Sequence, residues 1–431
     1  MVKKSFLSLI LFLVLLIPAA YAADEPTIKA GSAILALANG GQIVFDKNSD
    51  GRVFPSGLTK LMTALAAYER LGMDASIEVS ENISDYVSEL DLTMNLKPGE
   101  LLTSGDLIKS IIAGGANDAA IVLALESCGA VDEFVALMNT RAAELGMSST
   151  AFVNPTGIHS EYQYTTARDM LALYKALRNL PMIKSVLDSQ YITVPATNTN
   201  AARTYWTQNS LATGYYTSKY LYQYAKGGKT SSSSSGGYSI ICGAVKRDVE
   251  LICVVLNSAL DGGVNYSFVD AKNMFEYGFN SFTLNSVTVQ DSIVREIKVK
   301  NAKGTNRVLL QADNTLRCLI LDDDDITSIT SELDVPEYIT APLKKGDAAG
   351  KISYSYRGRP VGTVTLTVGN DISSSGLKAT GNAIAWFFSL KVIKIILFVI
   401  LAAVALYAAA VITLIRKTGI KKRRRKRRRR G

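Results

Sequence analysis

Apolar residues recur at intervals of three and four along several stretches of the chain, which is the pattern of a helix with one buried face. The clearest case spans 58–71, where Gly72 offers a natural stop. The same periodicity predicts helices over 105–127, 131–145, 169–177 and 270–277. Short apolar runs bounded by turn residues predict strands at 33–37, 42–45, 238–245 and 249–257. Strands with helices between them predict an α/β domain, a sheet with a helical cluster on one side.

Beyond residue 282 the helical periodicity fades and short alternating strands take its place. Such strands at 287–289, 307–311, 318–321 and 361–368 predict a small all-β second domain. The run Asp322 to Asp325 is expected to be a solvated turn, because it lacks the spaced ligands of a calcium loop. Residues 371–382 contain three serines and two glycines, which predicts a flexible linker.

Two apolar blocks lie at the ends of the chain. Residues 1–22 have a charged start, a short apolar stretch and Ala20-Tyr21-Ala22, which predicts a cleaved secretory signal rather than an N-terminal anchor. Residues 395–415 carry no charge, are long enough to cross a bilayer, and follow an aromatic segment that starts at Trp386. Basic residues follow this span, so the tail is expected in the cytoplasm and the main domains outside.

The net charge of +9 is unevenly distributed along the 431 residues. Residues 391–431 contain 14 basic and no acidic side chains, and the signal adds Lys3 and Lys4, so residues 23–390 carry −7. The basic tail fits attraction to anionic lipid headgroups, worth about 1 kcal/mol per basic residue near the surface. No nucleic-acid partner is expected, because the charge has no reading element beside it.

The cysteines and the histidine predict no metal site and no cofactor. The four cysteines are far apart and lack C-x-x-C spacing, and His159 is the single histidine, in a predicted surface loop. Cys242 and Cys253 flank the turn at Arg247-Asp248 symmetrically and are expected to face each other. A disulfide is conceivable in an exported protein, although two buried thiols are favoured.

Three short motifs occur in order along the chain. The motifs are Gly57-Leu58-Thr59-Lys60, Gly115-Ala116-Asn117 and Lys229-Thr230-Ser231. They resemble the Ser-x-x-Lys, Ser-x-Asn and Lys-Thr-Gly motifs of penicillin-recognising serine hydrolases. Glycine stands where the first two serines are expected, and Ser231 stands where the last glycine is expected.

Together with further blocks, the motifs resemble the serine-type D-alanyl-D-alanine carboxypeptidases, the low-molecular-mass penicillin-binding proteins of bacterial cell walls (peptidase family S11). The resemblance spans about 28–370 and includes Pro55-Ser56-Gly57-Leu58-Thr59-Lys60-Leu61-Met62-Thr63, Leu96-Lys97-Pro98-Gly99-Glu100, Asn154-Pro155-Thr156-Gly157, Thr165-Thr166-Ala167-Arg168-Asp169 and Ala341-Pro342-Leu343-Lys344-Lys345-Gly346. It implies a transpeptidase-like (β-lactamase-like) α/β domain over 23–282, a β-sandwich over 283–370, a linker over 371–394, a transmembrane helix over 395–415 and a cytoplasmic tail over 416–431.

The resemblance also assigns a role to each motif position. Lys60 matches the base that activates the nucleophile, and Asn117 matches a residue that holds the substrate amide. Lys229 and Thr230 match the groups that bind the terminal carboxylate of the peptidoglycan stem peptide. The remaining positions are altered or rely on the backbone: Gly57 replaces the nucleophile, Gly115 the relay serine and Ser231 the clearance glycine, while the amides of Gly57 and Ser232 match the oxyanion hole.

Three hypotheses follow from these substitutions. The first is a membrane-anchored relative that binds stem peptides or wall-synthesis proteins without forming an acyl-enzyme. The second is an active carboxypeptidase that uses Ser56 or a bound water, which requires a shifted register because adjacent helical residues point about 100° apart. The third is a scaffold whose function rests on the β domain.

A stretch of aromatic residues precedes the third motif. It runs from Tyr191 to Tyr224 and includes Tyr205, Trp206, Tyr215, Tyr216, Tyr220 and Tyr222. Aromatic faces can stack on sugars, but packing within the protein is the more frequent role of such residues.

Overall fold

The computed structural model describes residues 25–88, 91–375 and 391–427, so the predicted signal lies outside the described residues. The chain divides into two compact units. The first contains the described residues up to 288 together with 315–332 and 353–363. The second contains 289–314, 333–352 and the described residues from 364 onward.

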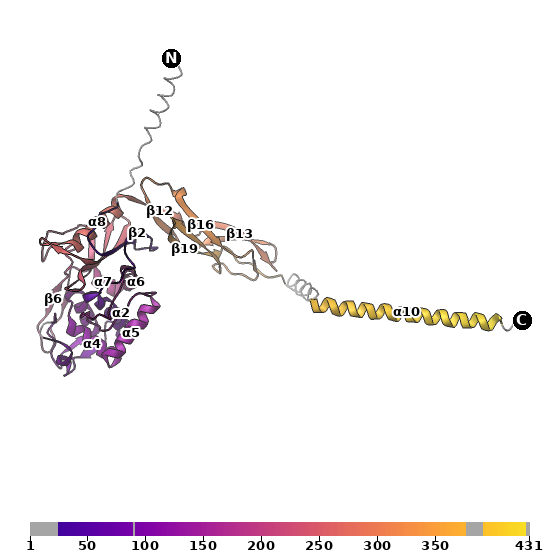
Figure 1. The fold of residues 1–431 in the computed structure, drawn as a ribbon, viewed down its shortest axis with the longest axis horizontal. Helices are drawn as coiled ribbons and strands as arrows, with labels where there is room; N and C mark the ends of the chain where they lie inside the picture. The colour runs from indigo at the N-terminus through magenta and orange to yellow at the C-terminus, as the bar shows by residue number, and fades with distance from the viewer. Residues whose placement is uncertain (1–24, 89–90, 376–390, 428–431) are drawn as a thin grey trace, which may run out of the picture. The chain divides into compact units, whose positions relative to one another are not determined.

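The first unit is built on a five-stranded antiparallel sheet in the order β2–β1–β9–β8–β7. Its strands are β1 (Ser32–Leu37), β2 (Ile43–Lys47), β7 (Ala225–Ser233), β8 (Gly237–Lys246) and β9 (Val249–Ser258). Figure 1 labels β2, one edge strand of this sheet. The predicted strands are confirmed, and β1 pairs with β2, and β8 with β9, as antiparallel hairpins. Strand β7 pairs only with β8 among the described strands and therefore forms an edge of the sheet.

Helices cover both faces of this sheet, whereas the sequence pattern predicted helices on one face. Ile34 and Ala36 of β1 pack with the larger cluster, which includes α2 (Thr59–Leu71), α4 (Asn117–Cys128), α5 (Val131–Glu144), α6 (Ala167–Arg178) and α7 (Pro181–Asp188). Leu35 of β1 points the other way and packs with α8 (Tyr266–Asn280). The prediction rested on the periodicity of the helices, which does not show on which face of the sheet each helix packs. Alternate residues of an apolar strand point to opposite faces, so the sheet has a core on each side.

The predicted helix over 105–127 is wrong in one respect, because it is broken in the middle. The segment contains α3 (Ser104–Lys109), a π-helical turn η3 (Ser110–Gly114) and then α4. Gly115 ends the turn in the left-handed conformation, with φ of 76°. Apolar periodicity continues through the break, so only the glycine pair 114–115 marked it in the sequence.

Other elements agree with the predicted periodicity or extend it. Helices α2, α5 and α6 match their predicted segments, and Gly72 caps α2. Helix α8 is longer than predicted, because the Asn265 side chain caps its first turn. Helix α7 was not predicted, although Pro181 at its first position is a recognised start signal.

Short strand pairs complete the first unit. They are β3 (Ser76–Glu78) with β4 (Leu101–Thr103), β5 (Tyr191–Val194) with β6 (Arg203–Trp206), β10 (Leu260–Asp261) with β11 (Val264–Asn265), and β12 (Phe282–Thr288) with β15 (Leu316–Leu321). A short 3₁₀ turn, η2 (Ile83–Tyr86), follows β3. The predicted turn after β15 is confirmed, and Asp324 within it accepts hydrogen bonds from Arg357.

The all-β character of the C-terminal region is confirmed. Its strands β13 (Ile293–Lys300), β14 (Arg307–Ala312), β16 (Ile329–Asp334), β17 (Tyr338–Thr340), β18 (Ala348–Tyr356) and β19 (Arg359–Val368) form a six-stranded sheet. The 3₁₀ turn η4 (Ile326–Ser328) precedes β16. Ile372 is buried and exchanges backbone hydrogen bonds with Leu343, and most of the predicted linker beyond it lies outside the described residues.

Two further predictions concern single features. Cys242 and Cys253 are directly opposed on β8 and β9, and both are buried free thiols, which confirms the favoured alternative. Helix α10 (Lys391–Arg427) contains the 20-residue segment Ile395–Leu414, which is long and apolar enough to cross a membrane.

Candidate active site

The first motif lies at the start of α2, where the backbone is strained. Ser56 opens the short 3₁₀ turn η1 (Ser56–Leu58) with φ of 49°, a left-handed conformation that a residue with a Cβ rarely adopts. Gly157 packs against this point so closely that a Cβ on it would lie 2.0 Å from the Ser56 carbonyl oxygen. The chain therefore makes a tight turn at the nucleophile position, although Gly57 carries no side chain.

The lysine of the first motif is buried. Lys60 is only 4% exposed, and its Nζ donates a hydrogen bond of 2.5 Å to the Thr156 carbonyl oxygen. Burial lowers the pKa of Lys60 to about 8, while Asp91 and Asp118 act in the opposite direction. The amine is thus partly neutral near physiological pH, but no side chain at position 57 can give it a proton.

The second motif lies on the left-handed turn between η3 and α4. Asn117 begins α4, and its Nδ2 donates a hydrogen bond of 2.9 Å to Asp91 Oδ1. Gly115 faces two side chains, because a Cβ on it would lie 3.2 Å from Leu92 Cδ2 and 4.0 Å from Lys229 Nζ. Leu92 therefore occupies space beside the position of the missing relay serine.

The third motif lies on the edge strand β7. Lys229 is 5% exposed, and its Nζ donates hydrogen bonds to the carbonyl oxygens of Ile111 and Ile112, at 2.8 and 3.1 Å. Burial, followed by the charge of Lys60, lowers the pKa of Lys229 to about 7. Next to it, Thr230 Oγ1 lies 3.5 Å from Gln208 Oε1. These contacts bring all three motifs together, as their order along the chain suggested.

The serine that replaces the third-motif glycine contacts the nucleophile position directly. The backbone N–H of Gly57 donates a hydrogen bond of 2.8 Å to Ser231 Oγ. A Cβ on Gly57 would lie 3.3 Å from the same oxygen. The amide that the family resemblance assigns to the oxyanion hole therefore already has a partner within the protein.

A second contact between serine side chains joins the segment before α2 to β7. Ser56 Oγ lies 2.6 Å from Ser233 Oγ, and the Gly236 N–H donates to Ser233 Oγ at 2.8 Å. The Ser56 hydroxyl is thus held at β7, whereas Lys60 donates to Thr156. Ser232, next along β7, lines a hollow together with the start of β8 and the end of β9.

Several residues at the site were not identified from the sequence. Asp91, Leu92, Thr156, Gln208 and Ser233 all contact motif positions. The Asn154-Pro155-Thr156-Gly157 block was noted as a resemblance, but the sequence did not indicate that it meets the first motif. The other four carry no local signal, because their roles depend on chain segments far away in the sequence.

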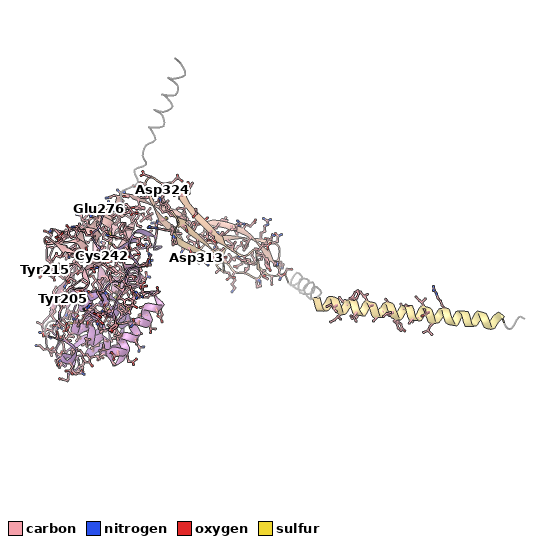
Figure 2. The ribbon with its side chains drawn as sticks, in the orientation of Figure 1. Tyr205, Tyr215, Cys242, Glu276, Asp313 and Asp324 are labelled. Atoms are coloured by element: carbon pink, nitrogen blue, oxygen red, sulfur yellow. The ribbon has the colours of Figure 1, made fainter. Side chains whose placement is uncertain are left out.

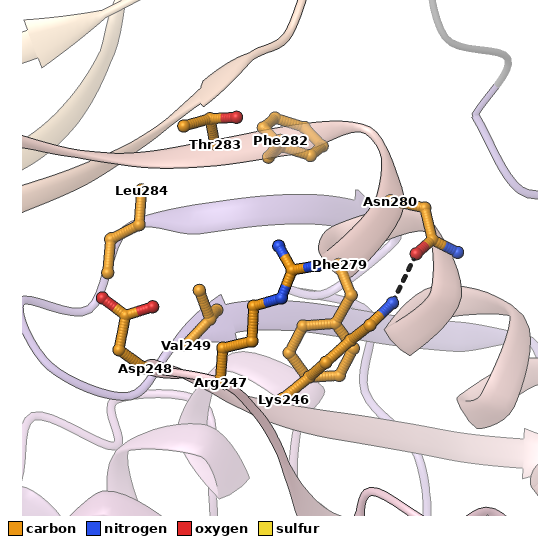
Figure 3. A pocket seen from close by; sticks show the side chains of 9 residues that line it. All are labelled: Lys246, Arg247, Asp248, Val249, Phe279, Asn280, Phe282, Thr283 and Leu284. Carbon is orange, nitrogen blue, oxygen red and sulfur yellow. Dashed lines mark hydrogen bonds between the residues drawn. The ribbon is translucent and has the colours of Figure 1, made fainter.

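Other candidate groups are not part of the three motifs. His159 is exposed, and its ring and that of Phe54 are arranged edge to face with 4.6 Å between their centroids. Within the described ranges, no group of three or more His, Cys, Asp or Glu residues could hold a metal ion. A hollow of about 380 Å³ lies at the β8–β9 turn, where Lys246 donates to Asn280 (Figure 3), and it contains no motif residue.

The geometry at Gly115 predicts a stability cost for restoring the relay serine. Gly115→Ser is expected to destabilise the fold by about 2 kcal/mol, because a Cβ in the left-handed region costs about 1 kcal/mol and Leu92 crowds it further. Gly99→Ser is the matched control, since Gly99 has a φ of +72° and no atom of the described residues lies within 4 Å of its Cβ position. Denaturant unfolding of both variants measures the difference, and equal costs would contradict the role of Leu92.

Comparisons with known proteins identify the relatives of this chain. Residues 19–259 match the family model of the D-alanyl-D-alanine carboxypeptidases, and residues 282–374 match that of the penicillin-binding protein 5 C-terminal domain. The chain is 26% identical over 354 residues to the D-alanyl-D-alanine carboxypeptidase DacF of Bacillus subtilis, covering 81% of this chain and 87% of the relative. It is also 26% identical over 383 residues to DacC of Escherichia coli, covering 85% and 90%.

Solved structures share the fold. Penicillin-binding protein 5 of Haemophilus influenzae superposes with a TM-score of 0.67 at 24% identity, covering 82% of this chain and all of that one. Penicillin-binding protein 3 of Streptococcus pneumoniae gives a TM-score of 0.68 at 19% identity, covering 81% and 100%. The predicted fold class, an α/β domain followed by a β-sandwich and an apolar C-terminal helix, is confirmed.

Proposed function

The chain belongs to the D-alanyl-D-alanine carboxypeptidase family, and from that premise we propose that it binds the D-Ala-D-Ala ends of peptidoglycan stem peptides without forming an acyl-enzyme. The observation that carries the proposal is the hydrogen bond from the Gly57 N–H to Ser231 Oγ. Gly57 has no hydroxyl to attack the substrate, and its amide is engaged by a side chain instead of a reacting oxygen. Both halves of acyl-enzyme formation, nucleophile and oxyanion stabilisation, are affected.

The groups that would hold the substrate support the binding half of the proposal. Lys229 offers a cation and Thr230 a hydroxyl for the terminal carboxylate, and Asn117 offers an amide. Lys229 is buried and held by two carbonyl oxygens, so its position is defined before a ligand arrives. Binding therefore needs little rearrangement at this end of the site.

The test combines binding and turnover on the full chain in detergent micelles. We expect saturable binding of a pentapeptide ending in D-Ala-D-Ala by calorimetry, with no free D-alanine above background. The matched ligand ends in L-Ala-L-Ala and reports on specificity. Release of D-alanine that disappears in Ser56→Ala would contradict the proposal and favour an active carboxypeptidase that uses Ser56. Absence of peptide binding would contradict it as well.

The pKa of Lys229 predicts how peptide binding depends on pH. A carboxylate binds the charged form of Lys229, whose pKa is lowered to about 7 by burial and by Lys60. Affinity is therefore highest below pH 7 and falls as the pH rises, to about a hundredfold weaker at pH 9 than at pH 6. Calorimetric titrations across this range measure the change, and an affinity that stays constant or rises with pH would contradict the assignment of Lys229.

We further propose that the protein is exported and anchored in the bacterial cell membrane by the span at 395–415, with its main domains outside the cytoplasm. The apolar segment Ile395–Leu414 of α10 and the basic residues after it support this topology. Anionic lipids at the basic tail and wall-synthesis proteins at the exported part are the proposed partners besides the stem peptide. We also propose that the α/β domain ends at residue 282 and the β domain at residue 370.

A further inference from the structure

The aromatic stretch ahead of the third motif separates into two groups with different surroundings. Tyr222 is buried and stacks on Phe275 of α8, so this part of the stretch is packing. The other group forms a row in which Trp206 stacks on Tyr215 with centroids 4.5 Å apart and planes 6° apart. Tyr191 leans on Trp206 at 5.0 Å, and Tyr216 meets Tyr215 edge to face at 5.0 Å. We call these four residues the aromatic row.

Three members of the aromatic row are open to solvent, and Trp206 is partly buried between its neighbours. Tyr191 is 54% exposed, and Tyr215 and Tyr216 are each 59% exposed. Tyr191 and Trp206 are directly opposed on the hairpin of β5 and β6, so they share one face of it. The opposite face is buried through Ile192, which fixes the row on a packed support.

Hydroxyl groups continue the same face of the hairpin. Thr193 and Thr204 are also directly opposed, and their exposed hydroxyl oxygens lie 3.1 Å apart. The face therefore presents two aromatic rings followed by two hydroxyl groups. The two threonines and the four residues of the aromatic row are all uncharged.

The hairpin adjoins the candidate active site. On its inner side, the Tyr205 ring packs on Gly114, where a Cβ would lie 2.8 Å from Tyr205 Cδ1. Two residues after Trp206, Gln208 reaches Thr230 of the third motif at 3.5 Å. Figure 2 labels Tyr205 and Tyr215 at the same edge of the unit. The aromatic row therefore lies on the outer face of a hairpin whose inner face packs against the segment of the second motif.

We propose that the aromatic row and the two threonines form a binding surface for uncharged N-acetylated sugars of the glycan strand. A pyranose ring has an apolar C–H face that stacks on an aromatic ring, and hydroxyl groups around its edge that pair with hydroxyl side chains. A polyanion would need lysine or arginine beside the rings, and a lipid surface would need aliphatic and basic residues. This inference rests on the proposed function, because stem peptides are covalently joined to such sugars.

The test uses a neutral sugar that carries no peptide. The chain contains two tryptophans, so the full-length Trp386→Phe variant in detergent micelles leaves Trp206 as the single reporter. Titration with chitotetraose is expected to change the Trp206 fluorescence in a saturable way. Adding Tyr215→Ala to this variant is expected to weaken the sugar affinity by about tenfold.

The matched control is Tyr162→Ala, because Tyr162 is 78% exposed and lies outside the row. It should leave the sugar affinity unchanged, and melting curves verify that each variant is folded. The inference is overturned if chitotetraose gives no saturable change, or if the affinity is the same in the variant that combines Tyr215→Ala with Tyr216→Ala. Pentapeptide binding measured on the same variants separates the two proposals, since sugar binding does not require the stem-peptide site.

Discussion

The combined exchange Gly57→Ser and Ser231→Gly is expected to turn a protein that penicillin does not label into one that it labels covalently. The first change supplies a hydroxyl at the start of α2, one helical turn before the partly neutral Lys60. The second removes the hydroxyl that now accepts the Gly57 N–H, so that this amide can bind the developing oxyanion. Both changes are needed because nucleophile and oxyanion donor act on the same carbonyl group.

Each single exchange should be labelled more slowly than the double variant, Gly57→Ser by about 10² to 10³ and Ser231→Gly by about 10⁶. In Gly57→Ser the new Cβ lies 3.3 Å from Ser231 Oγ, and the amide keeps its present partner. In Ser231→Gly the amide is released, but there is still no nucleophile. Losing a nucleophile typically costs on the order of 10⁶ in rate, and losing one oxyanion donor about 10² to 10³. The double variant should therefore gain several orders of magnitude while staying below its relatives, because Gly115 remains.

Fluorescent penicillin followed by gel electrophoresis measures this gain, and mass spectrometry identifies the labelled residue. The adduct is expected on position 57 of the double variant and on no residue of the unaltered chain. Labelling of the unaltered chain would refute the proposed function. A folded double variant that stays unlabelled would show that Ser231 is not the feature that blocks the site.

The second large effect is expected at a buried ion pair behind the site. Arg203→Ala should lower the free energy of unfolding by about 3–5 kcal/mol, because it leaves a buried carboxylate without its cation. Glu100 is fully buried, and besides Arg203 it accepts hydrogen bonds from Thr197 and Asn200. Arg203 also donates to the Met94 carbonyl oxygen at 2.9 Å, which connects β6 to the segment that carries Leu92.

Urea unfolding of the full chain measures the cost at Arg203. Lys29→Ala is the surface control, since Lys29 and Asp261 form an ion pair with exposed side chains, for which about 0–1 kcal/mol is expected. A double variant, Arg203→Met with Glu100→Gln, should be less destabilised than Arg203→Ala, because no buried charge remains unpaired. If Arg203→Ala and Lys29→Ala cost the same, the ion pair is not what stabilises the hairpin.

The same carboxylate makes the fold sensitive to acid. Burial by itself would raise the pKa of Glu100, but hydrogen bonds from Thr197, the Lys97 N–H, Asn200 and Arg203 together hold it below its ordinary value of 4.5. The stability that Glu100 contributes is therefore complete above that value and is lost as the pH falls through its lowered pKa.

The elements of the fold were largely predictable because their signals are local. The periodicity of 58–71 and the alternation within 238–245 and 249–257 arise from which side chains face a core, and the structure confirmed all three segments. Errors occurred where a local signal was ambiguous. The apolar period ran through Gly114 and Gly115, so the break before α4 was missed.

By itself, the sequence determined which chemical groups the site contains: the chain has no hydroxyl at position 57 and retains Lys60, Asn117, Lys229 and Thr230. Only the tertiary structure decided what the substituted residues do. Gly57 and Ser231 are 174 positions apart, and their hydrogen bond exists because β7 passes the start of α2. The sequence specifies which side chains are present, whereas a contact between distant segments depends on how the whole sheet and its helices pack.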